Sequence, residues 1–273
     1  MIKKQISYMD LKQICYSGQC FRMNPLQENR YELVANDRYL EIEQNGEEFT
    51  FFCEEEEFNT IWSHYFDLET DYEQIGNHIE ETDHYLKDAV ESGKGIRILN
   101  QDLWEMIITF IISQQNNIPR IRKCVQLLCE TYGQKKQNEK GGIYYSFPTS
   151  QVLAEADEET LRLCNLGYRS RYIQKTAWSV AHNEIHLKSL YQMNHTEARN
   201  ELLKLYGVGN KVADCICLFA LHHIEAFPID THIRQVLERE YPKGFPFERY
   251  KGYAGILQQY IFHYEINKKI AVR

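Results

Sequence analysis

The segment LLKLYGVGNKVADCICLFALHHIEAFPIDTHI, residues 202–233, combines two helical patterns with a glycine turn. An apolar-periodic helix ends in its first residues. A second helix is expected from Asn210 to about Leu221, where apolar residues recur at helical spacing. Gly207 and Gly209 stand between the two patterns, and glycine adopts positive φ without a steric penalty. The segment therefore predicts two helices joined by a tight hairpin.

The start of the second helix carries groups suited to chemistry on an anionic substrate. Its first backbone N–H groups have no partner within the helix, and with the turn amides they form a site for an anion such as a DNA phosphate. Lys211 lies on the first helical turn, and Asp230 follows a break at Pro228. A neutral lysine amine forms Schiff bases, and a nearby aspartate stabilises positive charge or takes part in proton transfer. Because most lysines are ordinary surface residues, Lys211 alone does not establish catalysis.

Taken together, these residues resemble the helix-hairpin-helix and Gly/Pro…Asp signature of base-excision DNA glycosylases, in particular the 8-oxoguanine DNA glycosylase branch. The superfamily turn commonly reads LPGVGxK, and Tyr206 stands here where the proline is usual. In the family, the lysine attacks C1′ of the damaged nucleotide and the aspartate assists. The resemblance therefore implies catalytic roles for Lys211 and Asp230. The residues that it implies for contacts with DNA phosphates are Gly207, Gly209 and His232.

The N-terminal part of the chain predicts an antiparallel sheet. Three short runs within residues 31–53 alternate between apolar and polar positions, and Asn45-Gly46 between the last two runs is a strong hairpin signal. The family resemblance extends to this region and implies a TBP-like sheet. We place this domain, with flanking helices, at residues 1–93.

The remainder of the chain predicts helices, so the fold class is α+β. Residues 103–113 are apolar on nearly all sides but too short to cross a membrane, which indicates a central buried helix. A second helix is predicted from Arg120 to Tyr132, and the charged residues 133–142 are predicted as a surface loop. We place a two-lobed, all-α helix-hairpin-helix glycosylase domain at residues 94–273, packed against the sheet.

Composition limits the classes of protein to which the chain can belong. Apolar residues make up 43% of the 273 residues, as in globular proteins. The sequence has no apolar run long enough for a membrane span and no secretory signal, so we expect a cytoplasmic location, nucleoid-associated in a prokaryote. Separately, we expect a monomer. The net charge of −8 argues against nonspecific nucleic-acid binding. A local cationic cluster can still bind DNA, and such binding should depend steeply on salt.

The cysteine pattern bears on cofactors. The eight cysteines do not have zinc-finger or zinc-ribbon spacing, and none follows Cys217. The four-cysteine iron–sulfur loop that endonuclease III-like relatives carry after the aspartate is therefore absent from this sequence. We expect no required cofactor and no metal held by side chains. A structural monovalent cation on the hairpin carbonyls is implied by the family resemblance alone.

The resemblance also implies a pocket for a flipped 8-oxoguanine base. In the motif SGQCFR, Gly18 matches the family glycine whose carbonyl accepts a hydrogen bond from N7–H, an atom protonated only in the oxidised base. Normal guanine would place a lone pair against that carbonyl, which is costly in a buried site. Gln258 matches the glutamine that binds the Watson–Crick edge, and Phe262, one helical turn later, would stack on the base. Cys215 would cover the opposite face.

A further set of residues is implied for the undamaged strand. Base flipping leaves a hole and an unpaired partner base. Gln115 replaces the family asparagine that fills this hole, and Tyr168 matches the family's wedge beside the orphan base. Arg120 and Arg169 match the two arginines that read cytosine, whose acceptor edge suits guanidinium donors. Separately, each residue has an ordinary structural interpretation; jointly, their order and spacing favour the family.

The sequence therefore predicts a bifunctional glycosylase/AP lyase that excises 8-oxoguanine opposite cytosine in double-stranded DNA. The predicted steps are base flipping, attack of Lys211 on C1′, a Schiff base and β-elimination. An oxidised-pyrimidine glycosylase/lyase is one alternative, although the missing cysteine loop speaks against it. A lesion-binding module without catalysis is another, although Lys211 and Asp230 are both present. A metabolic enzyme with a chance glycine motif is a third.

Overall fold

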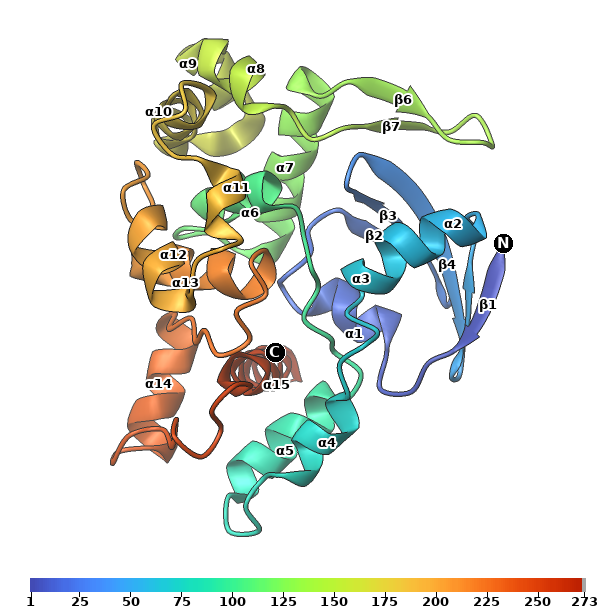
Figure 1. Ribbon diagram of the computed structural model, residues 1–273, viewed down its shortest axis with the longest axis vertical. Helices are drawn as coiled ribbons and strands as arrows, with labels where there is room; N and C mark the ends of the chain where they lie inside the picture. The colour runs from blue at the N-terminus through green and yellow to red at the C-terminus, as the bar shows by residue number, and fades with distance from the viewer. Residues whose placement is uncertain (272–273) are drawn as a thin grey trace.

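The structure is a computed structural model that describes residues 1–271, with side chains as far as Lys268. A five-stranded antiparallel sheet lies on one side of a largely helical body (Figure 1). The strand order is β1-β5-β4-β3-β2. The strands of this sheet are β1 (Ile2–Gln5), β2 (Met23–Gln27), β3 (Arg30–Ala35), β4 (Arg38–Asn45) and β5 (Glu48–Phe51). The predicted α+β class and N-terminal antiparallel sheet are confirmed.

The turns of the sheet follow from local sequence. Asn45 pairs with Glu48 across a two-residue loop in which Gly46 has a φ of +65°, so the predicted hairpin at Asn45-Gly46 is confirmed. The β3–β4 turn uses Asn36 and Asp37, both at positive φ, which these short polar residues tolerate. Strand β3 buries alternate residues, as its period-two pattern predicts.

Helices make up most of the remaining chain, with two short π-helical segments, η1 and η2. The first group is α1 (Leu11–Tyr16), α2 (Glu55–Glu57), η1 (Phe58–Trp62), α3 (Ser63–Tyr65), α4 (Tyr72–Asn77), α5 (His84–Gly93), α6 (Leu103–Ile112) and α7 (Ile118–Tyr132). The second group is α8 (Ser150–Glu155), α9 (Glu158–Leu161), η2 (Arg162–Leu166), α10 (Arg169–Ala181), α11 (Leu187–Leu190), α12 (His195–Leu202), α13 (Asn210–Phe219), α14 (Thr231–Glu240) and α15 (Ala254–Ala271).

Helix α6 confirms the prediction of a central buried helix, since only Trp104 among its residues is not fully buried. The next helix, α7, begins two residues before the predicted Arg120. Asn117 caps it by accepting a hydrogen bond from the Arg120 backbone N–H at 3.0 Å. Pro119 fits the first turn, because its missing N–H would have no partner there.

The region predicted as a surface loop, residues 133–142, is instead largely a β-hairpin. Strands β6 (Lys135–Gln137) and β7 (Ile143–Tyr145) pair antiparallel and extend beside the main sheet in Figure 1. Lys136 pairs with Asp37 on the β3–β4 turn, so an ion pair ties this hairpin to the sheet. Strand β6 has only polar residues, and each strand has three residues, too few to show hydrophobic alternation, which is why the sequence pattern did not predict them.

The apolar side chains form two hydrophobic cores. One contains buried residues between positions 6 and 66, together with Leu99, and underlies the sheet. The other contains Phe21 and the buried residues between positions 72 and 261. Figure 1 shows the helices in two groups, with α6–α13 above and α4, α5, α14 and α15 below, and α5 packs against α15. The predicted helical body in two groups is therefore confirmed. Helices α4 and α5 belong to this body although they lie within residues 1–93, and the predicted bounds of the two domains stay a prediction.

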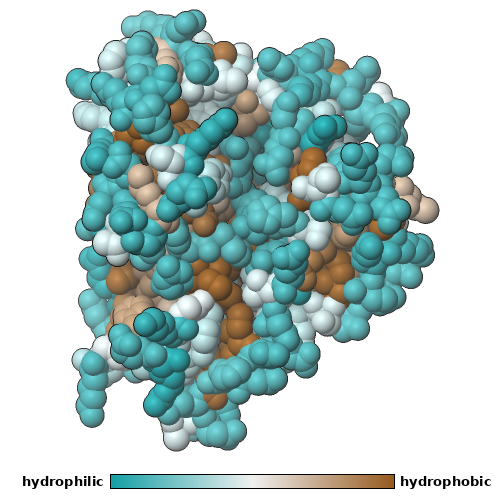
Figure 2. Space-filling model, in the orientation of Figure 1, coloured by the Kyte–Doolittle hydropathy of each residue, from teal (hydrophilic) through white to brown (hydrophobic). Residues whose placement is uncertain are grey.

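The surface and the helices also bear on membrane association. Hydrophilic residues predominate on the face shown in Figure 2, and apolar residues form small patches between them. Within residues 1–271, no helix has both the length and the apolar character that spanning a bilayer requires.

Candidate active site

The two glycines of the hairpin between α12 and α13 have different structural roles. Gly207 has a φ of +84°, and a Cβ atom there would lie 2.7 Å from the ring of Tyr172. Gly209 has an ordinary φ of −97°, and a Cβ atom there would meet nothing within 4 Å. Gly209 is the N-cap of α13, so it leaves the helix N-terminus open. The tight turn therefore requires glycine only at Gly207.

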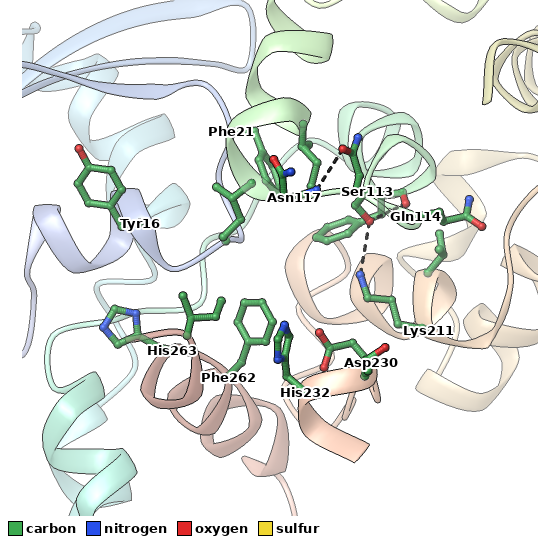
Figure 3. A pocket seen from close by; sticks show the side chains of 18 of the residues that line it. Tyr16, Phe21, Ser113, Gln114, Asn117, Lys211, Asp230, His232, Phe262 and His263 are labelled. Carbon is green, nitrogen blue, oxygen red and sulfur yellow. Dashed lines mark hydrogen bonds between the residues drawn. The ribbon is translucent and has the colours of Figure 1, made fainter. Parts of the chain in front are cut away.

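A cavity of about 1280 Å³ opens in front of this hairpin. It lies between the start of α13, the start of α14, α15, α1 and the turn after α6 (Figure 3). Its lining includes seven residues that the sequence analysis assigned to the site: Gly18, Gln115, Gly209, Lys211, Asp230, His232 and Phe262. Residues that lie far apart in the sequence are thus brought to one space.

Lys211 and Asp230 enter this cavity from different helices. The Lys211 Nζ lies 3.4 Å from Ser113 Oγ and 5.3 Å from the centre of the Phe110 ring. Asp230 is the N-cap of α14, and its Oδ1 accepts a hydrogen bond from the Ile233 N–H at 2.8 Å. Among the ion pairs of the described residues, none joins Lys211 to Asp230. The amine and the carboxylate therefore face the same space without being bound to each other (Figure 3).

Gly18 and Phe262 form a close contact on another side of the cavity. Gly18 has a φ of +80°, and a Cβ atom there would lie 3.0 Å from Phe262 Cε1 and 3.2 Å from Ile118 Cδ1. The Phe262 ring also meets His232 edge to face, with 6.2 Å between the ring centres. Backbone conformation and space both require glycine at position 18.

Gln258 and Cys215 are buried, and in the described part of the chain neither lines the cavity. Gln258 Nε2 donates a hydrogen bond to the Pro228 carbonyl at 3.0 Å, while its Oε1 is buried without a hydrogen-bond partner among the described residues. Burial raises the pKa of the Cys215 thiol to about 11, although Lys211 nearby acts in the opposite direction. Cys215 is therefore a neutral thiol at pH 7.

The residues assigned to the opposite strand are less closely gathered. Gln115 is exposed at a φ of +46° and lines the cavity. Tyr168 and Arg120 are exposed outside the described cavity lining. The Tyr168 ring lies 4.6 Å from the Arg169 guanidinium carbon.

Arg169 differs from the expectation that it presents free donors to an orphan cytosine. It is only 4% exposed. Its Nε donates to the Gln114 carbonyl at 2.9 Å, and its Nη2 donates to the Gln115 carbonyl at 3.1 Å. Because these two carbonyls belong to the turn after α6, Arg169 holds that turn from behind. Its guanidinium is thus already occupied by the protein in this structure.

Gln114 and His263 also border the cavity, and the sequence analysis assigned neither to the site. Gln114 Nε2 donates to the Gly207 carbonyl at 2.9 Å and so joins the turn after α6 to the hairpin. In the sequence, only its position in the run SQQNN indicated that Gln114 could lie at the site. His263 is buried beside Phe262, and burial lowers its pKa. In the sequence, only its position next to Phe262 indicated that His263 could lie at the site.

The predicted hairpin cation is not tested by the structure. Two hairpin carbonyls already accept hydrogen bonds, that of Leu205 from Val208 N–H at 3.2 Å and that of Gly207 from Gln114. Within the described residues, no group of three His, Cys, Asp or Glu side chains is arranged to hold a metal ion. The monovalent cation stays a prediction.

Comparison with known proteins identifies the class and then the family. Residues 108–243 match the HhH-GPD superfamily of base excision DNA repair proteins, as the hairpin and the Lys211–Asp230 arrangement indicate. Residues 1–107 match the N-terminal domain of 8-oxoguanine DNA glycosylase. A solved Clostridium acetobutylicum 8-oxoguanine glycosylase/lyase, bound to DNA with cytosine opposite 8-oxoguanine, is 35% identical; the match covers 98% of each chain with a TM-score of 0.91. The chain belongs to the 8-oxoguanine DNA glycosylase family.

Two curated relatives support the same family. The N-glycosylase/DNA lyase of Saccharomyces cerevisiae is 38% identical over 161 residues, which cover 55% of this chain and 43% of that protein. A probable N-glycosylase/DNA lyase of Methanothermobacter thermautotrophicus is 29% identical over 228 residues, which cover 73% of this chain and 72% of that protein. The chain thus spans less than half of the yeast protein.

Proposed function

We propose that this protein is a bifunctional DNA glycosylase/AP lyase that excises 8-oxoguanine opposite cytosine in double-stranded DNA. The observation that carries the proposal is the cavity that Lys211 and Asp230 share with Gly18 and Phe262. It brings a nucleophilic amine, a carboxylate and an aromatic surface to one cavity that has room for a flipped nucleotide. Membership of the family supports the same reaction.

The chemistry starts at the amine. Neutral Lys211 attacks C1′ of the flipped nucleotide, the bond from C1′ to the base breaks, and the base leaves with that electron pair and takes up a proton. Asp230, whose orientation is fixed by its cap on α14, stabilises the positive charge that develops on the sugar. The sugar ring then opens to a Schiff base with Lys211. Loss of the C2′ proton and of the 3′ phosphate breaks the strand by β-elimination, and hydrolysis frees the amine.

Selectivity for the oxidised base follows from one acceptor. The Gly18 carbonyl accepts a hydrogen bond from N7–H of 8-oxoguanine, whereas it would face the N7 lone pair of guanine. Phe262, which lines the cavity, stacks on one face of the base. Cys215 covers the other face only once DNA is bound, because it is buried outside the cavity lining in this structure. The buried Gln258 Oε1 without a partner supports a role as acceptor for the Watson–Crick edge, because such an atom is costly unless a ligand satisfies it.

Contacts with the rest of the duplex come from the cavity rim. The open N-terminus of α13, with Gly207, Gly209 and His232, binds phosphates of the damaged strand. Gln115 and Tyr168 occupy the space left by the flipped base. Arg120 and Arg169 read the orphan cytosine, and Arg169 must exchange its carbonyl acceptors in the turn for the base in order to do so.

Borohydride trapping tests this function directly. Wild-type protein and Lys211→Gln are incubated with a duplex that carries one 8-oxoguanine opposite cytosine, and reduction fixes any Schiff base as a covalent adduct. We expect an adduct with the wild type alone, while both proteins bind the lesion. Tight lesion binding without an adduct in the wild type would mean a monofunctional glycosylase or a lesion-binding module, and would exclude the lyase mechanism. If the wild type instead traps on oxidised pyrimidines and not on 8-oxoguanine, the substrate assignment is wrong.

A further inference from the structure

The loop that carries Gly18, here called the Gly18 loop (residues 17–20), is held by a buried network of amides. Ser17 and Gln19, the neighbours of Gly18, are both 0% exposed. Three glutamine side chains hold them. Gln19 bonds to Ser17, Gln101 before α6 bonds to Gln19, and Gln259 on α15 bonds to Ser17. All three glutamines are buried, and the catalytic chemistry proposed above uses none of them.

Gln19 binds a neighbouring segment through its side-chain amide. Its Nε2 donates to the Arg97 carbonyl at 2.9 Å, and its Oε1 accepts from the Leu99 N–H at 2.9 Å. This is the pattern that a paired strand would supply, so the amide replaces a backbone partner for residues 97–99. The same Nε2 lies 3.1 Å from Ser17 Oγ, which links the two neighbours of Gly18 to each other.

The other two glutamines connect the Gly18 loop to the elements that build the active site. Gln259 Nε2 donates to the Ser17 carbonyl at 2.7 Å, and Gln259 lies three residues before Phe262 on α15. Gln101 Nε2 donates to the Gln19 carbonyl at 2.9 Å, while its own N–H donates to the carbonyl of Phe219, the last residue of α13. Gln259 therefore ties the Gly18 loop to the helix that carries Phe262, and Gln101 ties it to the helix that carries Lys211.

The contact between Gly18 and Phe262 restricts the position of the Gly18 loop. A single added methyl group at Gly18 would lie 3.0 Å from the Phe262 ring, so Gly18 packs directly against the ring and the loop cannot move toward it. A carbonyl that must tell N7–H from a lone pair has to be held at hydrogen-bond distance. Since Gly18 has the positive φ of a flexible residue, its position depends on its anchored neighbours.

We propose that Gln259 and Gln19 are positioning residues for lesion recognition, which hold the Gly18 carbonyl in place beside Phe262. This inference rests on the proposed function, because it assigns that carbonyl to the N7 atom of the base. The network sets base selection and leaves the chemistry of Lys211 unaffected. The two activities of the enzyme can therefore be separated by substitution in this network.

The experiment compares two substrates under single turnover. One duplex carries 8-oxoguanine opposite cytosine, and the other carries a preformed abasic site opposite cytosine, which needs Lys211 but no base pocket. For Gln259→Leu we expect 8-oxoguanine excision to fall by about tenfold or more, because the Ser17 carbonyl loses its buried donor. Strand cleavage at the abasic site should stay within about threefold of the wild type.

Two further variants make the result specific. Gln174→Leu removes a similar bond, from Gln174 Nε2 to the Ala156 carbonyl at 2.7 Å, on α10 away from the cavity, and should leave the ratio of the two rates unchanged. Gln259→Asn keeps the amide on a shorter side chain, and its rate of 8-oxoguanine excision should lie between those of the wild type and Gln259→Leu. If Gln259→Leu does not fold, Gln259→Asn takes its place in the comparison.

The outcomes are distinguishable. A parallel fall of both activities in the Gln259 variants would show a merely structural role and overturn the inference. An unchanged rate of 8-oxoguanine excision would overturn it as well. If the wild type itself cleaves neither substrate, the proposed function is wrong, and the inference that rests on it is wrong as well. A selective loss at both Gln259 and Gln19→Leu would establish the network as part of base recognition.

Discussion

The Gly18 loop and the turn that carries Gln115 border the same cavity, but the chain holds them in different ways. The Gly18 loop is fully buried at Ser17 and Gln19; the amides of Gln101 and Gln259 bond to it, and the amide of Gln19 bonds it to residues 97–99. The Gln115 turn is exposed and is held by the guanidinium of Arg169 and by Gln114. The side that meets the lesion is therefore preformed, whereas the side that meets the opposite strand keeps donors that DNA can recruit.

This difference corresponds to two recognition problems. The lesion differs from guanine at the hydrogen-bonding edge by one oxygen and one proton, so a rigid acceptor gains discrimination. The opposite strand has to be bent and its base unpaired, so its contacts must form during binding. A buried amide network suits the first task, and an arginine that can exchange its carbonyl acceptors in an exposed turn for a base suits the second.

Gly18→Ala gives the largest expected effect and tests the preformed side. The added Cβ atom would meet Phe262 and Ile118, and alanine is strained at a φ of +80°. We expect 8-oxoguanine excision to fall by about a hundredfold in single-turnover assays, with cleavage at preformed abasic sites retained. Gly244→Ala is the matched control, because Gly244 has a φ of +96° but open space around it. Wild-type excision by Gly18→Ala would show that the Gly18 loop is adjustable after all.

Arg169→Gln tests the adjustable side and should have an intermediate effect. It leaves the Gln114 and Gln115 carbonyls without their donor and removes a buried charge, so we expect a loss of about 2 kcal/mol in unfolding free energy by urea titration. Excision opposite cytosine should fall by about tenfold, and the preference for cytosine over adenine should shrink. Arg171→Gln, an exposed neighbour on α10, should change neither quantity. An undiminished cytosine preference would remove Arg169 from the reading of the opposite base.

Cys215 gives the smallest expected effect, and it tests whether water reaches the buried thiol. Burial raises its pKa from 9.0 to about 11 in the folded protein, so the folded state retains the thiol proton more strongly than the unfolded chain. Its contribution to stability is complete below pH 9 and is lost as the pH rises toward 11. Between about pH 8 and about pH 10, the wild type should lose about 1 kcal/mol of unfolding free energy more than Cys215→Ser. Parallel pH curves would indicate a thiol in contact with water.

The features that could be predicted from the sequence are local ones. The hairpin glycines, the alternation in β3 and the uniform apolarity of α6 each lie within a short stretch, and each produced the predicted element. The helix α1 was not predicted, because it has only six residues and one capping contact from Asp10. The position of Phe262 beside Gly18 followed only from the resemblance to the family.

Other features depend on contacts between distant segments and left no pattern in the sequence. Arg169 was expected to face DNA, and its burial against the Gln115 turn results from contacts more than 50 residues away along the chain. The roles of Gln19 and Gln259 could not be predicted either, because a glutamine cannot be distinguished from an ordinary polar residue until its hydrogen-bond acceptor is known. Long-range side-chain bonds of this kind decide the details of the site but not the fold.

The bond between Gln259 and Ser17 spans 242 positions of the chain, which has a consequence for the order in which the protein is made. During synthesis the N-terminal sheet leaves the ribosome long before α15, so the Gly18 loop emerges without its last anchor. Base recognition is completed only when the final helix docks. Until α15 docks, the Ser17 carbonyl lacks its donor and the helical core lacks Ile256, Leu257 and Ile261, so the base pocket and the core around the hairpin are completed in the same step.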